Sequence, residues 1–130
     1  MKTKILFIIE LILILCSCDP LFHDDFIIVN ECNDNITVEI EDYNQNRDTF
    51  NLYANQDTIF YFNEWAGGYS QIEYISKLFS SIRIKKNNIY SQINYNNYQL
   101  WVKENIESSK HNAYYTRVRY YLYIKPEDFE

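Results

Sequence analysis

Few side chains of this 130-residue chain are of the types that catalyse reactions at neutral pH, since it has three cysteines and two histidines. If a histidine acted as a general base, it would have to be His111, which lies in a polar stretch. The sequence has no glycine-rich phosphate loop and no Gly-x-Ser-x-Gly elbow, and its Cys and His residues are not paired at metal-ligand spacing. We therefore expect no cofactor, no metal site and no catalytic residues.

Two acidic pairs have the residue types that glycosidases use for acid and base catalysis. They are Asp42 with Asp48, and Glu104 with Glu107. In a chain with 18 acidic residues such pairs are expected by chance, so they are interpreted as surface residues. The chain is predicted not to be an enzyme, and a small hydrolase is kept as an alternative.

The cysteine with the most specific surroundings is Cys18. Lys2 and Lys4 precede an apolar run over residues 5–15 that is interrupted only by Glu10, which is the layout of a secretory signal peptide. As a helix this run would span about 16 Å, well short of the roughly 30 Å of a bilayer's hydrocarbon core. Residues 1–17 are therefore predicted to direct export and to take no part in the fold.

The stretch Leu15-Cys16-Ser17-Cys18 resembles the lipobox of bacterial lipoproteins. The resemblance implies that a signal helix is cleaved off between Ser17 and Cys18 and that the Cys18 sulfur then carries a diacylglyceryl group. The membrane would be a partner through this lipid. The alternative is an ordinary secretory peptide with Cys18 as a plain thiol, or an uncleaved anchor.

The resemblance also implies a location in the Gram-negative cell envelope, with the outer membrane favoured. Residues after the lipidated cysteine act as sorting signals in lipoproteins. Asp19 resembles an inner-membrane retention signal of some Gram-negative groups, whereas Asp24-Asp25 resembles a surface-export signal of others. The periplasmic and the surface face therefore both stay open.

The remaining chain suits one domain and is acidic, because the whole sequence has 18 Asp and Glu against 12 Lys and Arg. Nucleic acid is a poor partner for such a surface, since binding it needs clustered Lys and Arg. With Cys16 removed and Cys18 lipidated, Cys32 is left alone and is predicted to be a small buried hydrophobe. A functional or intermolecular thiol is the alternative.

Residues 18–25 are predicted to be a tether, because Pro20 and a charged far end disfavour regular structure. His23 beside Asp24 and Asp25 has the residue types of a metal site, but a flexible tether does not fix ligand geometry. The folded domain is expected over residues 26–130.

Alternating apolar residues and turn-forming residues predict short strands in this domain. The expected strands cover residues 26–29, 36–41, 49–53, 58–62, 81–85, 89–95, 98–103 and 114–124. Hairpins are expected at Asn33-Asp34-Asn35 and Asn87-Asn88, a short helix over about 71–79, and a loop over 104–112. This pattern predicts an all-β, immunoglobulin-like antiparallel sandwich with one short helix.

The segments Leu78–Ile84, Trp101 and Tyr121–Ile124 are also similar to those of small Gram-negative lipoproteins built on such sandwiches. That resemblance covers about the last half of the chain. It implies no particular activity.

The last strand offers a candidate binding surface. Its alternation places five residues on the face away from the core, namely Tyr115, Arg117, Arg119, Tyr121 and Tyr123. Tyrosines beside arginines can stack on sugar rings or anchor a protein partner. The alternative is that these cross-strand pairs only stabilise the sheet.

The leading prediction is a lipid-anchored envelope lipoprotein with a non-catalytic binding or structural sandwich. An immunity lipoprotein that blocks an incoming toxin is one alternative, which small size, acidity and anchoring all suit. A small envelope hydrolase is the second alternative.

Overall fold

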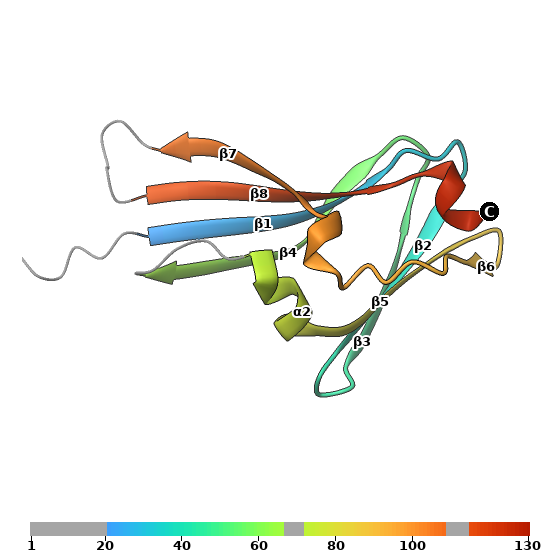
Figure 1. The fold of residues 1–130 in the computed structure, drawn as a ribbon, viewed down its shortest axis with the longest axis horizontal. Coiled ribbons are helices and arrows are strands. Elements are labelled where there is room, and N and C mark those ends of the chain that lie inside the picture. The colour runs from blue at the N-terminus through green and yellow to red at the C-terminus, as the bar shows by residue number, and fades with distance from the viewer. Residues whose placement is uncertain (1–20, 67–71, 109–114) are drawn as a thin grey trace, which may run out of the picture.

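The computed structural model describes residues 21–66, 72–108 and 115–130. The predicted signal peptide, the lipobox with Leu15, Ser17 and Cys18, and His111 lie outside these residues. The described part of the chain forms two four-stranded sheets, here named sheet A and sheet B (Figure 1). It contains no helix long and apolar enough to cross a membrane.

Sheet A contains both the first and the last strand of the described chain. Its spatial order is β4 (Asp57–Ala66), β1 (Leu21–Asn30), β8 (Tyr115–Ile124) and β7 (Val102–Ser108). β1 is antiparallel to β4 and parallel to β8, and β8 is antiparallel to β7. The central pair of sheet A therefore joins strands from opposite ends of the sequence.

Sheet B is antiparallel throughout. Its order is β3 (Arg47–Leu52), β2 (Ile36–Asp42), β5 (Phe79–Lys86) and the short β6 (Ile89–Tyr90). A one-turn 3₁₀ helix, η1 (Ile72–Tyr74), continues into α2 (Ile75–Leu78) before β5. Two further 3₁₀ turns are η2 (Tyr98–Leu100), before β7, and η3 (Pro126–Phe129), after β8.

The core lies between the sheets and takes alternate residues from each. Val118, Tyr120 and Leu122 of β8 are buried in one cluster with Val38 of β2 and Ile84 of β5. Alternation along these three strands produces this arrangement, since successive side chains of a strand point to opposite faces. The predicted all-β, immunoglobulin-like sandwich is confirmed, except that the β1–β8 pair is parallel.

An aromatic group forms the centre of this core. The ring of Phe26 on β1 lies 5.1 Å from Tyr120, 5.8 Å from Trp101 and 5.9 Å from Tyr61, measured between centroids. The indole nitrogen of Trp101 donates to the Tyr95 carbonyl at 3.1 Å. The segment between β6 and β7 is thereby held against the core without being a strand.

Several local predictions are confirmed. Asn87 and Asn88 both have positive φ, 51° and 65°, as a two-residue hairpin turn between β5 and β6 requires. The short helix lies within its predicted range. Cys32 is free and buried in the core, where burial raises the pKa of its thiol.

The predicted tether is wrong for residues 21–25, which form the first half of β1 and pair with strands on both sides. The expected hairpin at 33–35 is also wrong, because β1 and β2 belong to different sheets. Asn30 is buried at this crossing, where its amide donates to the carbonyls of Asp34, Leu52 and Tyr53. These side-chain bonds replace the ladder that a hairpin would have supplied.

Strand boundaries in the second half of the chain also differ from the predictions. The strand expected over 89–95 ends at Tyr90. The one expected over 98–103 begins as η2, and its strand continues through Ser108 where a loop was expected. Pairing with the long strand β8 overrides the polar composition of residues 104–108.

Candidate functional site

The five predicted binding residues of β8 lie on the outer face of sheet A, as their alternation indicated. Their neighbours Val118, Tyr120, Leu122 and Ile124 are buried in the core, whereas these five are partly exposed. The five side chains are only partly exposed because β8 is a central strand, with β1 and β7 on its two sides.

The two arginines of this face are both paired with Asp25 of β1. Arg117 places its Nη2 2.7 Å and its Nε 2.8 Å from Asp25 Oδ2, and Arg119 Nε is 3.4 Å from the same oxygen. The parallel register sets Asp25 beside Arg119 on the same outer face. Only 1% of Asp25 is exposed, so these cations shield its carboxylate from water.

His23 extends this ion-pair cluster to β4. Its Nε2 is 2.8 Å from Asp25 Oδ1 and its Nδ1 is 2.8 Å from Glu64 Oε1, while its ring stacks on Phe62 at 5.7 Å. The row Glu64–His23–Asp25–Arg117 therefore links three strands.

The ionisation of Asp25 follows from its surroundings. Burial alone opposes the charged form, but hydrogen bonds from Arg117 and His23 and their positive charge outweigh it. The pKa of Asp25 is thus lower than usual, and its carboxylate is ionised at neutral pH.

The contacts of this ion-pair cluster are suited to holding β4, β1 and β8 together. Both ring nitrogens of His23 lie against carboxylates, so neither points toward a position that a substrate could occupy. Successive residues point to opposite faces, so Asp24 lies on the core side and does not join His23 and Asp25 in a metal trio. Within the described ranges, no group of three or more His, Cys, Asp and Glu could hold a metal ion.

The tyrosines form the second part of the outer face. The rings of Tyr121 and Tyr123 stack with centroids 6.0 Å apart and planes 20° apart. Beside them, Tyr123 and Val102 line a hollow of about 230 Å³ that reaches Leu100 and Ile93. Burial and the charges of nearby groups, Glu104 first among them, raise the pKa of Tyr123, which keeps its hydroxyl protonated.

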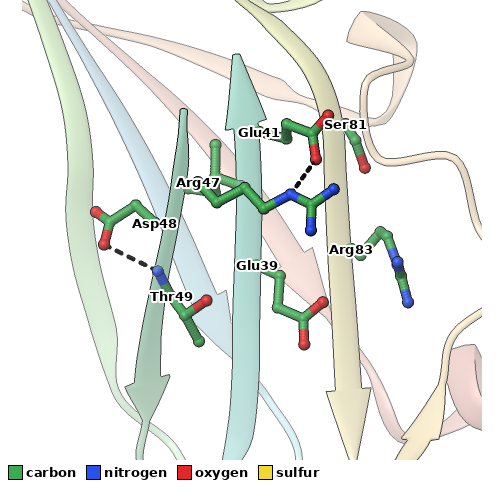
Figure 2. Close-up of a pocket in the computed structure, with 8 residues that line it drawn as sticks. Glu39, Glu41, Arg47, Asp48, Thr49, Ser81 and Arg83 are labelled. Atoms are coloured by element: carbon green, nitrogen blue, oxygen red, sulfur yellow. Dashed lines mark hydrogen bonds and ion pairs between the residues drawn. The ribbon is translucent and has the colours of Figure 1, made fainter. Parts of the chain in front are cut away.

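The outer face of sheet B has a different character. A hollow of about 280 Å³ lies there, and Figure 2 shows Arg47 of β3 reaching across β2 to Glu41. Its lining residues are Glu39, Ile40, Glu41, Arg47, Asp48, Thr49, Ser81 and Arg83. Arg47 Nε lies 2.6 Å from Glu41 Oε2, and Glu39 bonds to Lys85 at 3.1 Å and to the Tyr90 hydroxyl at 2.8 Å. These paired side chains form a salt-bridged surface open to solvent.

The acidic residues named from the sequence as possible catalytic pairs have different surroundings. Asp42 accepts three hydrogen bonds from Asn44 and Asn46 in the β2–β3 turn. The bonds from Asn46 and Asn44 lower the pKa of Asp42. Asp48 instead lines the hollow of sheet B. Glu104 lies on β7 beside Arg119, and the side chain of Glu107 is outside what the structure describes.

Sequence reasoning missed the residues that organise this face, which are His23, Asp25 and Glu64. For His23 and Asp25 the sequence did carry a signal. In a strand, alternate residues share a face, so one face would take His23, Asp25, Ile27 and Val29, and the other would take Phe22, Asp24, Phe26 and Ile28. Extending the alternation of the predicted strand over residues 26–29 toward the N-terminus would have placed Asp25 on the face that points away from the core. Its arginine partners lie more than 90 residues away and carry no local mark.

Three comparisons with known proteins found no match. No family model matches the chain, no curated protein matches it, and no solved structure matches its fold.

Proposed function

We propose that this protein is a lipid-anchored protein of the Gram-negative cell envelope that acts by binding. In this proposal Cys18 carries the lipid, and the outer face of sheet A contacts a protein or a glycan. The contact residues are Tyr115, Arg117, Arg119, Tyr121 and Tyr123.

The observation that carries the binding role is the burial of Asp25 beneath the side chains of this face. Arg117 and Arg119 are fixed by the same carboxylate oxygen, and the stacked tyrosines stand further along the same strand. Side chains that are already ordered lose little conformational entropy when a partner binds. The outer face of sheet A is thus pre-organised, whereas Arg47 on sheet B is largely exposed.

The chemistry of the tyrosine pair indicates the kind of partner. Stacked phenol rings offer a flat apolar surface with hydroxyls at its edge, which suits the apolar face of a sugar ring or a protein hot spot. The neighbouring exposed side chains of Leu100 and Val102 extend the apolar area. A partner that covers both would bury aromatic and aliphatic surface together.

The anchor is tested by labelling cells with a radioactive fatty acid. We expect label in the wild-type protein and none in Cys18→Ala. A labelled Cys18→Ala variant, or a mature N-terminus other than Cys18 in mass spectrometry, would contradict the anchor.

The binding face is tested with a photo-crosslinking phenylalanine analogue placed at Tyr121 in intact cells. The matched control is the same analogue at Tyr53, which is 61% exposed and lies after β3. We expect a discrete crosslinked product from position 121 that is absent from position 53. No product from 121, or the same products from both positions, would contradict the proposal. A toxin as the crosslinked partner would identify the binding role as immunity.

A further inference from the structure

The first strand begins very close to the residue that the proposed function supplies with a lipid. Only Asp19 and Pro20 separate Cys18 from Leu21, the first residue of β1. Three peptide units span at most about 11 Å whatever their conformation. The lipid-bearing residue is therefore never farther than this from the start of sheet A.

This end of sheet A has little freedom to move away from the anchor. β1 is a central strand, and Leu21 is already paired with Ala66 of β4 on one side and Tyr115 of β8 on the other. The ion-pair cluster of His23 and Asp25 ties the same three strands together two to four residues further on. Releasing β1 would break both ladders and the cluster.

Exposed apolar side chains are found at this end of the outer face. Leu21 of β1 is 39% exposed. Phe62 of β4, which is in register with Asp25 of β1, is 63% exposed. The Phe62 ring does not swing freely, because it stacks on His23 with planes only 7° apart. Nearby, Glu64 Oε1 is paired with His23 Nδ1, and Asp25 is paired with Arg117. An aliphatic and an aromatic side chain beside paired charges suit the boundary between lipid headgroups and acyl chains.

We infer that the end of the outer face of sheet A marked by Leu21 and Phe62 rests on the lipid surface that holds Cys18. This inference depends on the proposed lipid anchor. Tyr121 and Tyr123 lie six and eight residues beyond Tyr115, about 20 and 26 Å further along β8. In Figure 1 the C-terminus and β6 lie at the opposite end of the molecule from the start of β1. Tyr115, in register with Leu21, lies at the membrane end in this orientation, so the partner contacts the face from Arg117 onward. The stacked tyrosines are carried away from the membrane, toward a partner in the aqueous phase.

The orientation is tested with the lipidated protein in vesicles of phosphatidylethanolamine and phosphatidylglycerol. An environment-sensitive fluorophore is attached at Phe62→Cys, and a nitroxide on the lipid headgroup serves as quencher. The matched control is Ile89→Cys on β6, which is 58% exposed at the far end. Wild-type protein treated with the same fluorophore measures the background fluorescence from labelling of the buried Cys32. We expect strong quenching at position 62, as well as at Leu21→Cys, and none at position 89.

Vesicle flotation separates the two proposals. Protein that floats but shows equal quenching at positions 62 and 89, or none at 62 and 21, would overturn the orientation and leave the anchor intact. Protein that does not float would contradict the anchor and the orientation with it. A fluorescence change at position 62 that depends on protein concentration without vesicles would replace the lipid surface by a second copy of the chain.

Discussion

Two outward-facing surfaces of the same sandwich contain ion pairs, and they differ in how far water is excluded. On sheet A, Asp25 is almost completely buried and has two arginines and His23 around it. On sheet B, the carboxylates of Glu39 and Glu41 stay partly exposed, each with one basic partner. β1 and β8 are central strands flanked by long side chains, whereas Arg47 belongs to the edge strand β3. Central position alone does not desolvate a charge pair, because the partly exposed Glu39–Lys85 pair also joins two central strands, β2 and β5. Asp25 is desolvated because Arg117, Arg119 and His23 all cover the same carboxylate.

This difference has an energetic consequence. A pair in water gains little, because the solvent screens it and two side chains lose freedom. A buried pair whose partner is removed leaves an uncompensated charge in a poorly solvated place. The same chemical change should therefore have a large effect on sheet A and a small one on sheet B.

The largest effect is expected for Asp25→Asn. The change leaves Arg117, Arg119 and His23 facing a neutral amide, so the free energy of unfolding should fall by about 3 kcal/mol. Urea denaturation followed by circular dichroism measures this loss. A loss as small as that of Glu41→Gln on sheet B would show that the two faces do not differ.

Acidification tests the same carboxylate without a substitution. The folded-state pKa of Asp25 is lower than its ordinary value of 3.8, so its stabilising contribution is complete above that value and is lost as pH falls through the lowered folded pKa. Stability should therefore decline below pH 4 by no more than the effect of Asp25→Asn. Denaturation curves between pH 5 and pH 2 measure it, and the decline should be shallower in Asp25→Asn. Equal slopes in both proteins would assign the decline to other groups.

A smaller loss is expected for His23→Gln. Glutamine cannot contact Glu64 and Asp25 with two ring nitrogens as the imidazole does, so about 1 to 2 kcal/mol of stability should be lost. Asp25 keeps its two arginines in this variant. Thermal unfolding against the wild type measures the change, and a loss matching that of Asp25→Asn would mean that His23, not the arginines, is the main partner.

The smallest effect is expected for Glu41→Gln. Its partner Arg47 is largely exposed, so at most about 0.5 kcal/mol should be lost. The difference from wild type should shrink in 1 M NaCl, where exposed charges are screened. A loss of several kcal/mol, or one insensitive to salt, would contradict the contrast between the two faces.

The face assignments in the second half of the chain needed only the sequence. The alternation of residues 115–124 determines which side chains are buried, because a strand of either sheet must place its apolar parity in the core. The pair Asn87-Asn88 likewise determines its turn, since few residues accept positive φ. These features depend on neighbours within a few positions, so they are predictable.

The burial of Asp25 was decided by the tertiary structure alone. In isolation the stretch His23-Asp24-Asp25 is polar, and burying its charges would cost more than a strand there could recover. Parallel pairing of β1 with β8 brings in Arg117 and Arg119 from 92 and 94 residues away, and their charges offset that cost. A charge has no preferred environment until its counterion is placed, so the pairing of distant strands determined what local sequence could not.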